Sequence, residues 1–427
     1  MNLLKEVLKR QVYPAMGCTE PVTVALCAAH AAKLLAEPVE EALLVLDSGT
    51  YKNGMGVTLP NAGGQKGNLL AAALGVVIAD PRLKMEILRA VTVPLLRQAQ
   101  RLVKSRKVRI SVLSGHTGLR VEARLKGRRH EAACVIAGSH TDLVFSEKDG
   151  RKIIDSAPGA VAGADRYKKI LKRCALRDLV RLAERMDAKD EAWIRRGVEM
   201  NLAAARQGMK LKKVGFYLQD LRRRGYLLDD VFSSSKILTA CATDLRMDGH
   251  ATPVMSSGES GNQGIVAILV PWNVGQAFEV PDRTVLRSIA LSHLMNAYVK
   301  LFTGGLAPIC GCAIAAGVGA AAAIVYQRNG RDLPALTLAV NNVISDLGGM
   351  LCDGAKSGCA LKVVSSTDCA IRSAYMGINH YGITQREGFV GRSAEETIKN
   401  LGRISSVGMA AVDHTIVGIM LDKQARP

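Results

Sequence analysis

The stretch KVRISVLSGHTGLRVEARLKGRRHEAACVI, residues 107–136, decides the fold. Apolar and polar residues alternate with a period of two at 108–113, 119–125 and 130–136, which is the spacing of half-buried β-strands. Glycines and basic residues typical of tight turns separate these runs, and residues 142–145 continue the pattern. The stretch therefore predicts an antiparallel β-meander.

On both sides of the meander the apolar spacing lengthens to about 3.6 residues, which predicts helices. Almost everything beyond residue 165 shows this longer spacing. Before the meander, a short apolar run predicts a strand at 42–47, and a loop rich in glycine and asparagine follows at 49–67. The helices predicted before the meander cover residues 3–12, 20–36, 69–79 and 83–103.

These patterns predict an α+β fold, with a mainly helical body and an α/β portion that contains the antiparallel β-meander. A chain of 427 residues is long enough for two domains, or for one domain with an insertion. We expect residues 1–39 and 161–427 to form the helical domain and residues 40–160 to form the α/β portion. The uncharged stretch 306–326 contains Pro308 and several glycines, so it predicts a buried helix and not a membrane span.

Composition limits the classes of function. The net charge is +19, but aromatic residues make up only 4% of the chain and no nucleic-acid-binding motif is present. We therefore expect the basic residues to form solvated faces that attract small anions, and the composition argues against nucleic-acid binding. Ten cysteines without regular spacing, and an N-terminus without a signal-peptide pattern, predict a reducing, cytoplasmic location and no disulfide framework.

Three short phrases place a cysteine where a helix is expected to begin. They are GCTEP at 17–21, PICGC at 308–312 and CDGAK at 352–356, and Thr19 is the expected cap of the first helix. The free N–H groups and the dipole of a helix N-terminus stabilise a thiolate, and a thiolate is the form of cysteine that binds metal. The candidate metal ligands are Cys18, Cys312 and Cys352, with Cys310 and Cys359 as alternatives.

Two glycine-rich loops are candidates for binding a small anion. Residues 51–57 read YKNGMGV and residues 256–264 read SSGESGNQG. Both mix glycines with polar donors, and successive backbone N–H groups in such loops form anion-binding nests. An ordinary surface turn is the alternative for each loop, but together with the thiols they predict a carboxylate-binding pocket. The candidate substrate-binding residues are Asn53, Ser257, Ser260, Asn262 and Gln263.

At these residues the chain resembles the iron–sulfur L-cysteine desulfidases, which are related to the alpha chain of the iron–sulfur-dependent L-serine dehydratases. The resemblance extends over nearly the whole length. Its phrases are GCTEP, YKNGMG, SGNQG, ICGCAIAAG and CDGAKSGC, which begin at residues 17, 51, 260, 309 and 352, and the closing segment 387–420 is also similar.

The resemblance implies a 4Fe–4S cluster that is held by three cysteines and leaves one iron open. Carried over by motif, the ligands would be Cys18, Cys312 and Cys352, and the helical domain would be the cluster-binding catalytic domain. In the serine dehydratases the third ligand follows the counterpart of Cys352 at a longer interval than Cys359 does. Cys359 therefore stays in reserve.

The resemblance also implies a lyase that converts L-cysteine to pyruvate, ammonia and sulfide. Lys356 or Lys52 would be the base, provided that burial or a neighbouring cation lowers its pKa. L-Serine, or another β-substituted amino acid, is the alternative substrate. A non-catalytic protein that senses metal or redox state, or binds nucleic acid, is the alternative of another class. We expect a small-molecule amino-acid substrate, no membrane partner and, because such dimers are common, a homodimer.

Overall fold

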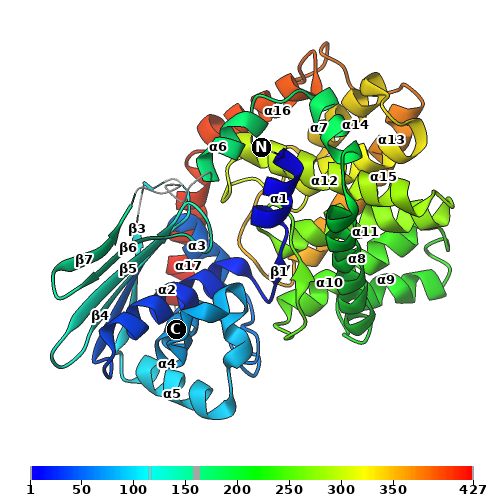
Figure 1. Ribbon diagram of the computed structural model, residues 1–427. Coiled ribbons are helices and arrows are strands. Elements are labelled where there is room, and N and C mark those ends of the chain that lie inside the picture. The colour runs from blue at the N-terminus through cyan, green and yellow to red at the C-terminus, as the bar shows by residue number, and fades with distance from the viewer. Residues whose placement is uncertain (1, 114, 117, 157–163, 426–427) are drawn as a thin grey trace.

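The computed structural model describes residues 2–113, 115–116, 118–156 and 164–425. Figure 1 shows a twisted sheet with helices on one face and, beside it, a larger body of helices. The predicted α+β class is confirmed by this arrangement. The predicted domain boundary at residues 160–161 lies outside the described residues, so the division into domains stays a prediction.

The elements are labelled in Figure 1 in chain order. The strands are β1 (Pro14–Ala15), β2 (Glu41–Asp47), β3 (Val108–Leu113), β4 (Arg120–Lys126), β5 (Glu131–Ala137), β6 (Leu143–Lys148), β7 (Arg151–Asp155) and β8 (Val254–Met255). The helices are α1 (Leu3–Gln11), α2 (Thr19–Leu35), α3 (Ser48–Met55), α4 (Asn68–Ile78), α5 (Val93–Lys104), α6 (Ala164–Leu171), α7 (Leu176–Glu184), α8 (Ala188–Gly208), α9 (Val214–Arg223), α10 (Val231–Met247), α11 (Gly261–Ala277), α12 (Asp282–Thr303), α13 (Ala315–Asn329), α14 (Leu333–Leu347), α15 (Cys359–Ile378), α16 (Ala394–Arg403) and α17 (Val412–Ala425). Pro81–Ala90 forms 3₁₀ turns, and Ile404–Gly408 forms a π-helical turn.

Six strands form the main sheet in the order β3-β2-β4-β5-β6-β7. β2 pairs with β3 in parallel, and every other neighbouring pair in this sheet is antiparallel. The side chains of Ala42, Leu44 and Leu46 are buried and alternate along β2, as expected for a strand with one covered face. A separate two-stranded sheet pairs β1 with β8 and brings the N-terminal segment to the helical body.

The predicted meander is correct for β4, β5 and β6 and wrong for β3, and β7 extends it beyond the predicted strands. β2 lies between β3 and β4, so the run at 108–113 does not pair with the run that follows it. Parallel neighbours need a long crossover, and α3, α4 and α5 supply it between β2 and β3. The turn predicted at 114–118 includes residues 114 and 117, which lie outside the described residues. Period-two alternation identifies a strand but does not say which strands pair.

α2 covers one face of the sheet, packing on β4 and β5, and α4 packs against α2 (Figure 1). The helices approach closely, because a Cβ atom at Gly75 would lie 2.0 Å from the carbonyl oxygen of Ala25. The Cys27 thiol donates to the carbonyl oxygens of Val121 and Cys134, at 3.4 Å each, which makes it a core residue of this interface. The predicted domain division places α2, within residues 1–39, in the helical domain. In the structure the side chains of α2 belong to the core beneath the sheet.

The glycine-rich segment predicted as a loop at 49–67 begins with helix α3. Asp47 caps this helix, since its Oδ1 accepts a hydrogen bond from Thr50 N at 2.9 Å and its Oδ2 accepts one from Thr50 Oγ1 at 2.6 Å. Gly54 lets the helix press against Asn68, whose Oδ1 would be 1.7 Å from a Cβ atom there. Capping and close packing stabilise this helix, and its sequence does not show the 3.6-residue spacing of apolar residues that predicts helices.

The larger portion packs α11, α12, α13, α14 and α15 around a second core. α13 is buried from Ala315 to Gln327, which confirms the buried helix predicted within residues 306–326. α17 returns to the sheet side, where it packs on α3. Among the described residues no single helix is long and apolar enough to cross a membrane, although Ala394–Gly408 and Val412–Lys423 together, bent by 48°, reach that length and composition.

Candidate active site

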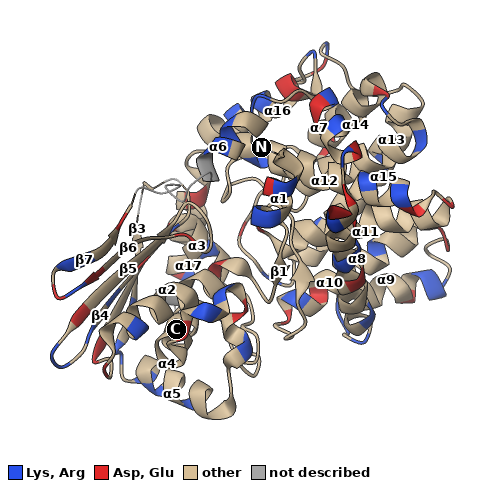
Figure 2. Ribbon diagram, viewed as in Figure 1, with Lys and Arg blue, Asp and Glu red and all other residues tan. Residues whose placement is uncertain are grey.

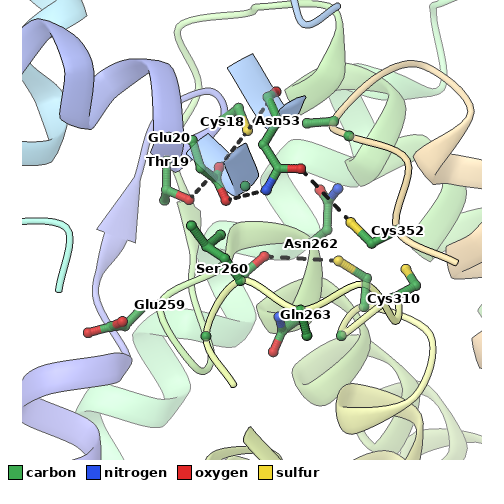
Figure 3. A pocket seen from close by; sticks show the side chains of 18 of the residues that line it. Cys18, Thr19, Glu20, Asn53, Glu259, Ser260, Asn262, Gln263, Cys310 and Cys352 are labelled. Carbon is green, nitrogen blue, oxygen red and sulfur yellow. Dashed lines mark hydrogen bonds between the residues drawn. The ribbon is translucent and has the colours of Figure 1, made fainter. Parts of the chain in front are cut away.

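One pocket lies where the two portions meet (Figure 3). Its cavity of about 80 Å³ is lined by the start of α2, by α3, by the loop before α11, by the end of α12 and by the segments that precede α13 and α15. All ten cysteines are free thiols, as the sequence predicts. Half of them line this pocket: Cys18, Cys310, Cys312, Cys352 and Cys359.

Cys18 lies at the N-cap of α2, one position before the predicted cap Thr19. Its thiol donates to Glu20 Oε2 at 2.8 Å, and Thr19 Oγ1 donates to the same oxygen at 3.0 Å. Burial opposes ionisation of Glu20, but His140 and these hydrogen bonds prevail and lower the pKa of the carboxyl. Burial, and then the Glu20 charge, raises the pKa of Cys18 well above its usual value. The lowering of this pKa that a helix N-terminus would cause is therefore outweighed.

Asn53 connects the two sides of the pocket (Figure 3). Its side-chain Nδ2 donates to Glu20 Oε1 at 2.9 Å, and its backbone carbonyl oxygen lies 3.9 Å from Cys18 Sγ. On the opposite side, Cys352 Sγ lies 3.9 Å from Asn53 Oδ1. One residue of α3 thus contacts two of the predicted ligands, which come from distant parts of the sequence.

Backbone hydrogen bonds hold the other cysteine segments side by side. The N–H of Cys310 donates to the carbonyl oxygen of Met350 at 2.8 Å, and the N–H of Cys352 donates to that of Pro308 at 2.7 Å. These bonds form an antiparallel bridge between the PICGC and CDGAK phrases. The bridge explains how two motifs separated in sequence line one cavity.

The prediction that Cys312 and Cys352 stand directly at helix starts is wrong. α13 begins only at Ala315, and α15 begins only at Cys359. After Cys352 the chain turns at Gly354, whose φ of +93° favours glycine and whose Cβ position would be 2.5 Å from the Lys52 carbonyl oxygen. The segment wraps over α3 before it enters α15.

The thiols on these segments are close enough to influence one another. A hydrogen bond between Cys312 and Cys310 raises the pKa of Cys312 and lowers that of Cys310. Burial raises the pKa of Cys352, and it raises the pKa of Cys359 to about 11. Cys18 packs in a small apolar cluster against which Cys359 also packs. Among the described residues, however, no three His, Cys, Asp or Glu side chains gather closely enough to hold a single metal ion.

The two lysines predicted as bases differ in position. Lys52 lines the pocket and is 1% exposed, but its Nζ donates to Asp413 Oδ1 at 2.5 Å and to the Cys352 carbonyl oxygen at 2.7 Å. Lys356 does not line the pocket and pairs with Asp353. The geometry makes Lys52 a residue that positions the Cys352 segment, and it gives Lys356 no contact with the cavity.

The predicted substrate-binding loop is divided between the pocket and the core. Ser260, Asn262 and Gln263 line the cavity, and Gln263 Oε1 is buried without a hydrogen-bond partner. Ser260 Oγ lies 4.0 Å from Cys312 Sγ. Ser257 is fully buried outside the cavity, where its Oγ bonds to two side chains of α12 at 2.8 and 2.9 Å. Its position indicates a structural role.

Three titratable residues of the pocket, His140, Arg246 and Glu259, were not singled out from the sequence as site residues. His140, which follows β5, and Arg246, near the end of α10, both line the cavity. Glu259 also lines it, with a φ of +65° that is rare for a residue other than glycine, and its Oε2 lies 3.8 Å from His140 Nδ1. An acidic residue inside the SSGESGNQG loop was the available signal for Glu259.

Known proteins match this chain along its whole length. A UPF0597 protein of Elusimicrobium minutum is 56% identical over 423 residues, covering 99% of this chain and 100% of that protein. UPF0597 proteins of Geobacter sulfurreducens and Clostridium tetani are 54% and 35% identical, and each alignment covers at least 99% of both chains. No solved structure matches. The serine dehydratase alpha chain family matches residues 83–418. The chain therefore belongs to the serine dehydratase alpha chain family, a family of lyases.

Proposed function

We propose that the protein is an iron–sulfur-dependent lyase that removes the β-substituent of L-cysteine, with sulfide, pyruvate and ammonia as products. The observation that carries this proposal is the set of five thiols around one pocket that also contains acidic, basic and amide side chains. Membership of a lyase family supports the reaction class. The small cavity supports a small-molecule substrate.

The donor set fits a 4Fe–4S cluster by its chemistry, because thiolates are the ligands of such clusters. Cys18, Cys312 and Cys352 would hold it, with Cys310 and Cys359 in reserve. When bound, the cluster supplies a Lewis-acidic iron.

Elimination also requires a base that removes the proton from the substrate Cα. His140 is 7% exposed and lines the cavity, its Nδ1 faces Glu259 Oε2 at 3.8 Å, and its Nε2 has no hydrogen-bond partner among the described residues. Imidazole is the commonest general base in enzymes, so we propose His140 for this role. Lys52 would position Cys352 through its bond to that carbonyl oxygen. Ser260 and Gln263 would contact the substrate.

The test is anaerobic reconstitution of the full chain, followed by measurement of bound iron, labile sulfide and product formation. With L-cysteine, the wild type should release sulfide and pyruvate. Cys352→Ser should bind less iron and lose this activity. Cys369→Ser is the matched control, because Cys369 is a buried thiol of α15 that does not line the pocket. A wild type that binds no iron would overturn the proposal.

L-Serine is the second candidate substrate, favoured by the name of the matching family. The same pocket residues would serve both reactions, which differ in the leaving group. Comparing kcat/KM for L-cysteine and L-serine on one reconstituted preparation separates the two. The homodimer and the cytoplasmic location stay predictions.

A binding protein without catalysis is the candidate of another class. Figure 2 shows Lys and Arg spread over both portions with Asp and Glu among them, and this distribution does not favour nucleic-acid binding. Salt-dependent binding of DNA or RNA without product formation would favour that class.

A further inference from the structure

Arg246 is a buried cation that points to an anionic ligand. Its side chain is 3% exposed, it lines the pocket, and its Nε has no hydrogen-bond partner. Nη1 donates to Asn262 Oδ1 at 3.0 Å. Among the described residues no carboxylate lies within ion-pair distance of Arg246. An unpaired guanidinium away from water is costly, so its retention here points to an anionic partner in the pocket.

The surroundings of Arg246 are shaped to hold the guanidinium in place. A Cβ atom at Gly261 would lie 2.3 Å from Arg246 Nε and 2.8 Å from its Cζ, so glycine leaves the space that the side chain occupies. Asn262 accepts from Nη1 and donates through its Nδ2 toward Met247 Sδ at 3.6 Å, which fixes the amide. The arginine is therefore held in one orientation before any ligand arrives.

The three lysines of the pocket already have partners within the chain. Lys52 pairs with Asp413, Lys362 pairs with Asp353 at 2.5 Å, and Lys300 donates to the Gly258 carbonyl oxygen. The C-terminal end of α10 offsets part of the Arg246 charge, because partial negative charge gathers there, but only by a fraction of a unit charge. Among the described lysine and arginine side chains of the pocket, Arg246 is thus the one with a buried donor nitrogen that has no hydrogen-bond partner.

We propose that Arg246 binds the carboxylate of the substrate. A guanidinium matches the two oxygens of a carboxylate, and such charge-assisted bonds are stronger than neutral ones. The choice of an amino acid as ligand rests on the proposed function, whereas the anion site itself rests on Arg246, Asn262 and Gly261. In this proposal Arg246 recognises the carboxylate, and the thiols hold the cluster.

The experiment measures binding without turnover, by isothermal titration calorimetry on the reconstituted full chain. L-Alanine is the probe, because it has the carboxylate and ammonium of the expected substrate but no β-leaving group. L-Alaninamide lacks the carboxylate and is the matched ligand. Arg246→Gln removes the cation, and Arg246→Lys keeps a charge without the paired donors. Arg287→Gln is the control variant, since Arg287 also has a buried Nε without a partner but lies outside the pocket.

We expect the wild type and Arg287→Gln to bind L-alanine and to prefer it to L-alaninamide. Arg246→Gln should weaken L-alanine binding by roughly tenfold or more, the range for losing a hydrogen bond to a charged group, and Arg246→Lys should fall between. Equal wild-type affinity for both ligands, or no L-alanine binding, would overturn the proposal without reliance on any variant. Unchanged affinity in Arg246→Gln would also overturn it. Arg246-dependent binding without any elimination activity would retain the site and reject the lyase.

Discussion

The ammonium of Lys52 and the carboxylate of Asp413 lie 2.5 Å apart although 361 positions separate them in the chain. The pair joins α3 to α17, and the same ammonium holds the backbone of Cys352. Asp413→Asn would leave a buried cation without its counter-charge, so we expect a loss of about 3 kcal/mol in the free energy of unfolding, measured by urea denaturation. Iron retention should fall as well, because the Cys352 segment loses its anchor.

The control for that loss is the surface pair of Lys152 with Asp155, whose side chains are 59% and 60% exposed. Asp155→Asn should leave the urea midpoint nearly unchanged, since solvent screens exposed pairs. Equal midpoints for Asp413→Asn and the wild type would contradict the structural role of the Lys52–Asp413 pair.

Cys310 and Cys312 are alternatives for one of the proposed ligand positions, and serine substitutions can distinguish them. Cys310 is tied by its backbone to Met350, whereas Cys312 Sγ lies 4.0 Å from Ser260 Oγ on the loop before α11. We expect Cys312→Ser to lose most of the bound iron and Cys310→Ser to keep most of it, as measured by iron content and visible absorbance. The reverse order would make Cys310 the ligand.

Asn53 should matter more than an ordinary polar residue, because it contacts Glu20 and lies next to Cys18 and Cys352. Loss of a residue that orients metal ligands typically costs about 10–100-fold in affinity or activity. Asn53→Ala should therefore release iron to a chelator faster by about that factor. Asn379→Ala, at an exposed helix end, is the control, and equal release rates would refute the bridging role.

The contact between α2 and α4 leaves no room for a side chain at Gly75. A Cβ atom there would be 2.0 Å from the Ala25 carbonyl oxygen, which is backbone and cannot turn away. Gly75→Ala should cost about 1–3 kcal/mol of unfolding free energy in thermal or urea denaturation. Gly418→Ala, in α17 with open space around it, should be neutral or slightly stabilising. Equal effects at the two glycines would be inconsistent with this packing.

Asp244 should make stability fall as the pH rises. Burial raises the pKa of its carboxyl to about 6, whereas an unfolded chain gives about 3.9. Between these values the folded state binds more protons than the unfolded state. The contribution of Asp244 to the free energy of unfolding is therefore complete below about pH 4 and is lost by about pH 6. The urea midpoint of Asp244→Asn, relative to that of the wild type, should therefore rise from pH 4 to pH 7. A difference independent of pH would contradict this linkage.

The sequence predicted where strands and helices lie better than it predicted which strands pair with each other. Alternation located β4, β5 and β6, but it could not place β2 between β3 and β4, because pairing depends on the crossover through α3 to α5. β7 was missed, because its exposed polar residues leave little apolar signal. Helix α3 was missed because an aspartate cap and close packing at Gly54 form it.

The cysteines of the candidate site could be found because short phrases surround them, and all three predicted ligands line the pocket. Arg246 and His140 could not be found in this way, since each lies in a stretch without a motif and reaches the cavity only through the tertiary fold. Lys356 shows the opposite error, because proximity in sequence to Cys352 did not bring its side chain to the cavity.

Cys18 is the N-cap of α2, whose side chains belong to the core beneath the sheet, whereas Cys312 and Cys352 pack against the helical core. During synthesis the ribosome releases Cys18 long before the CDGAK phrase exists. A nascent or truncated chain therefore lacks part of the proposed ligand set, however well its first portion folds. On the proposed function, iron and sulfide would have to be delivered to the finished protein, and separation of the two portions would expose the proposed cluster to oxygen.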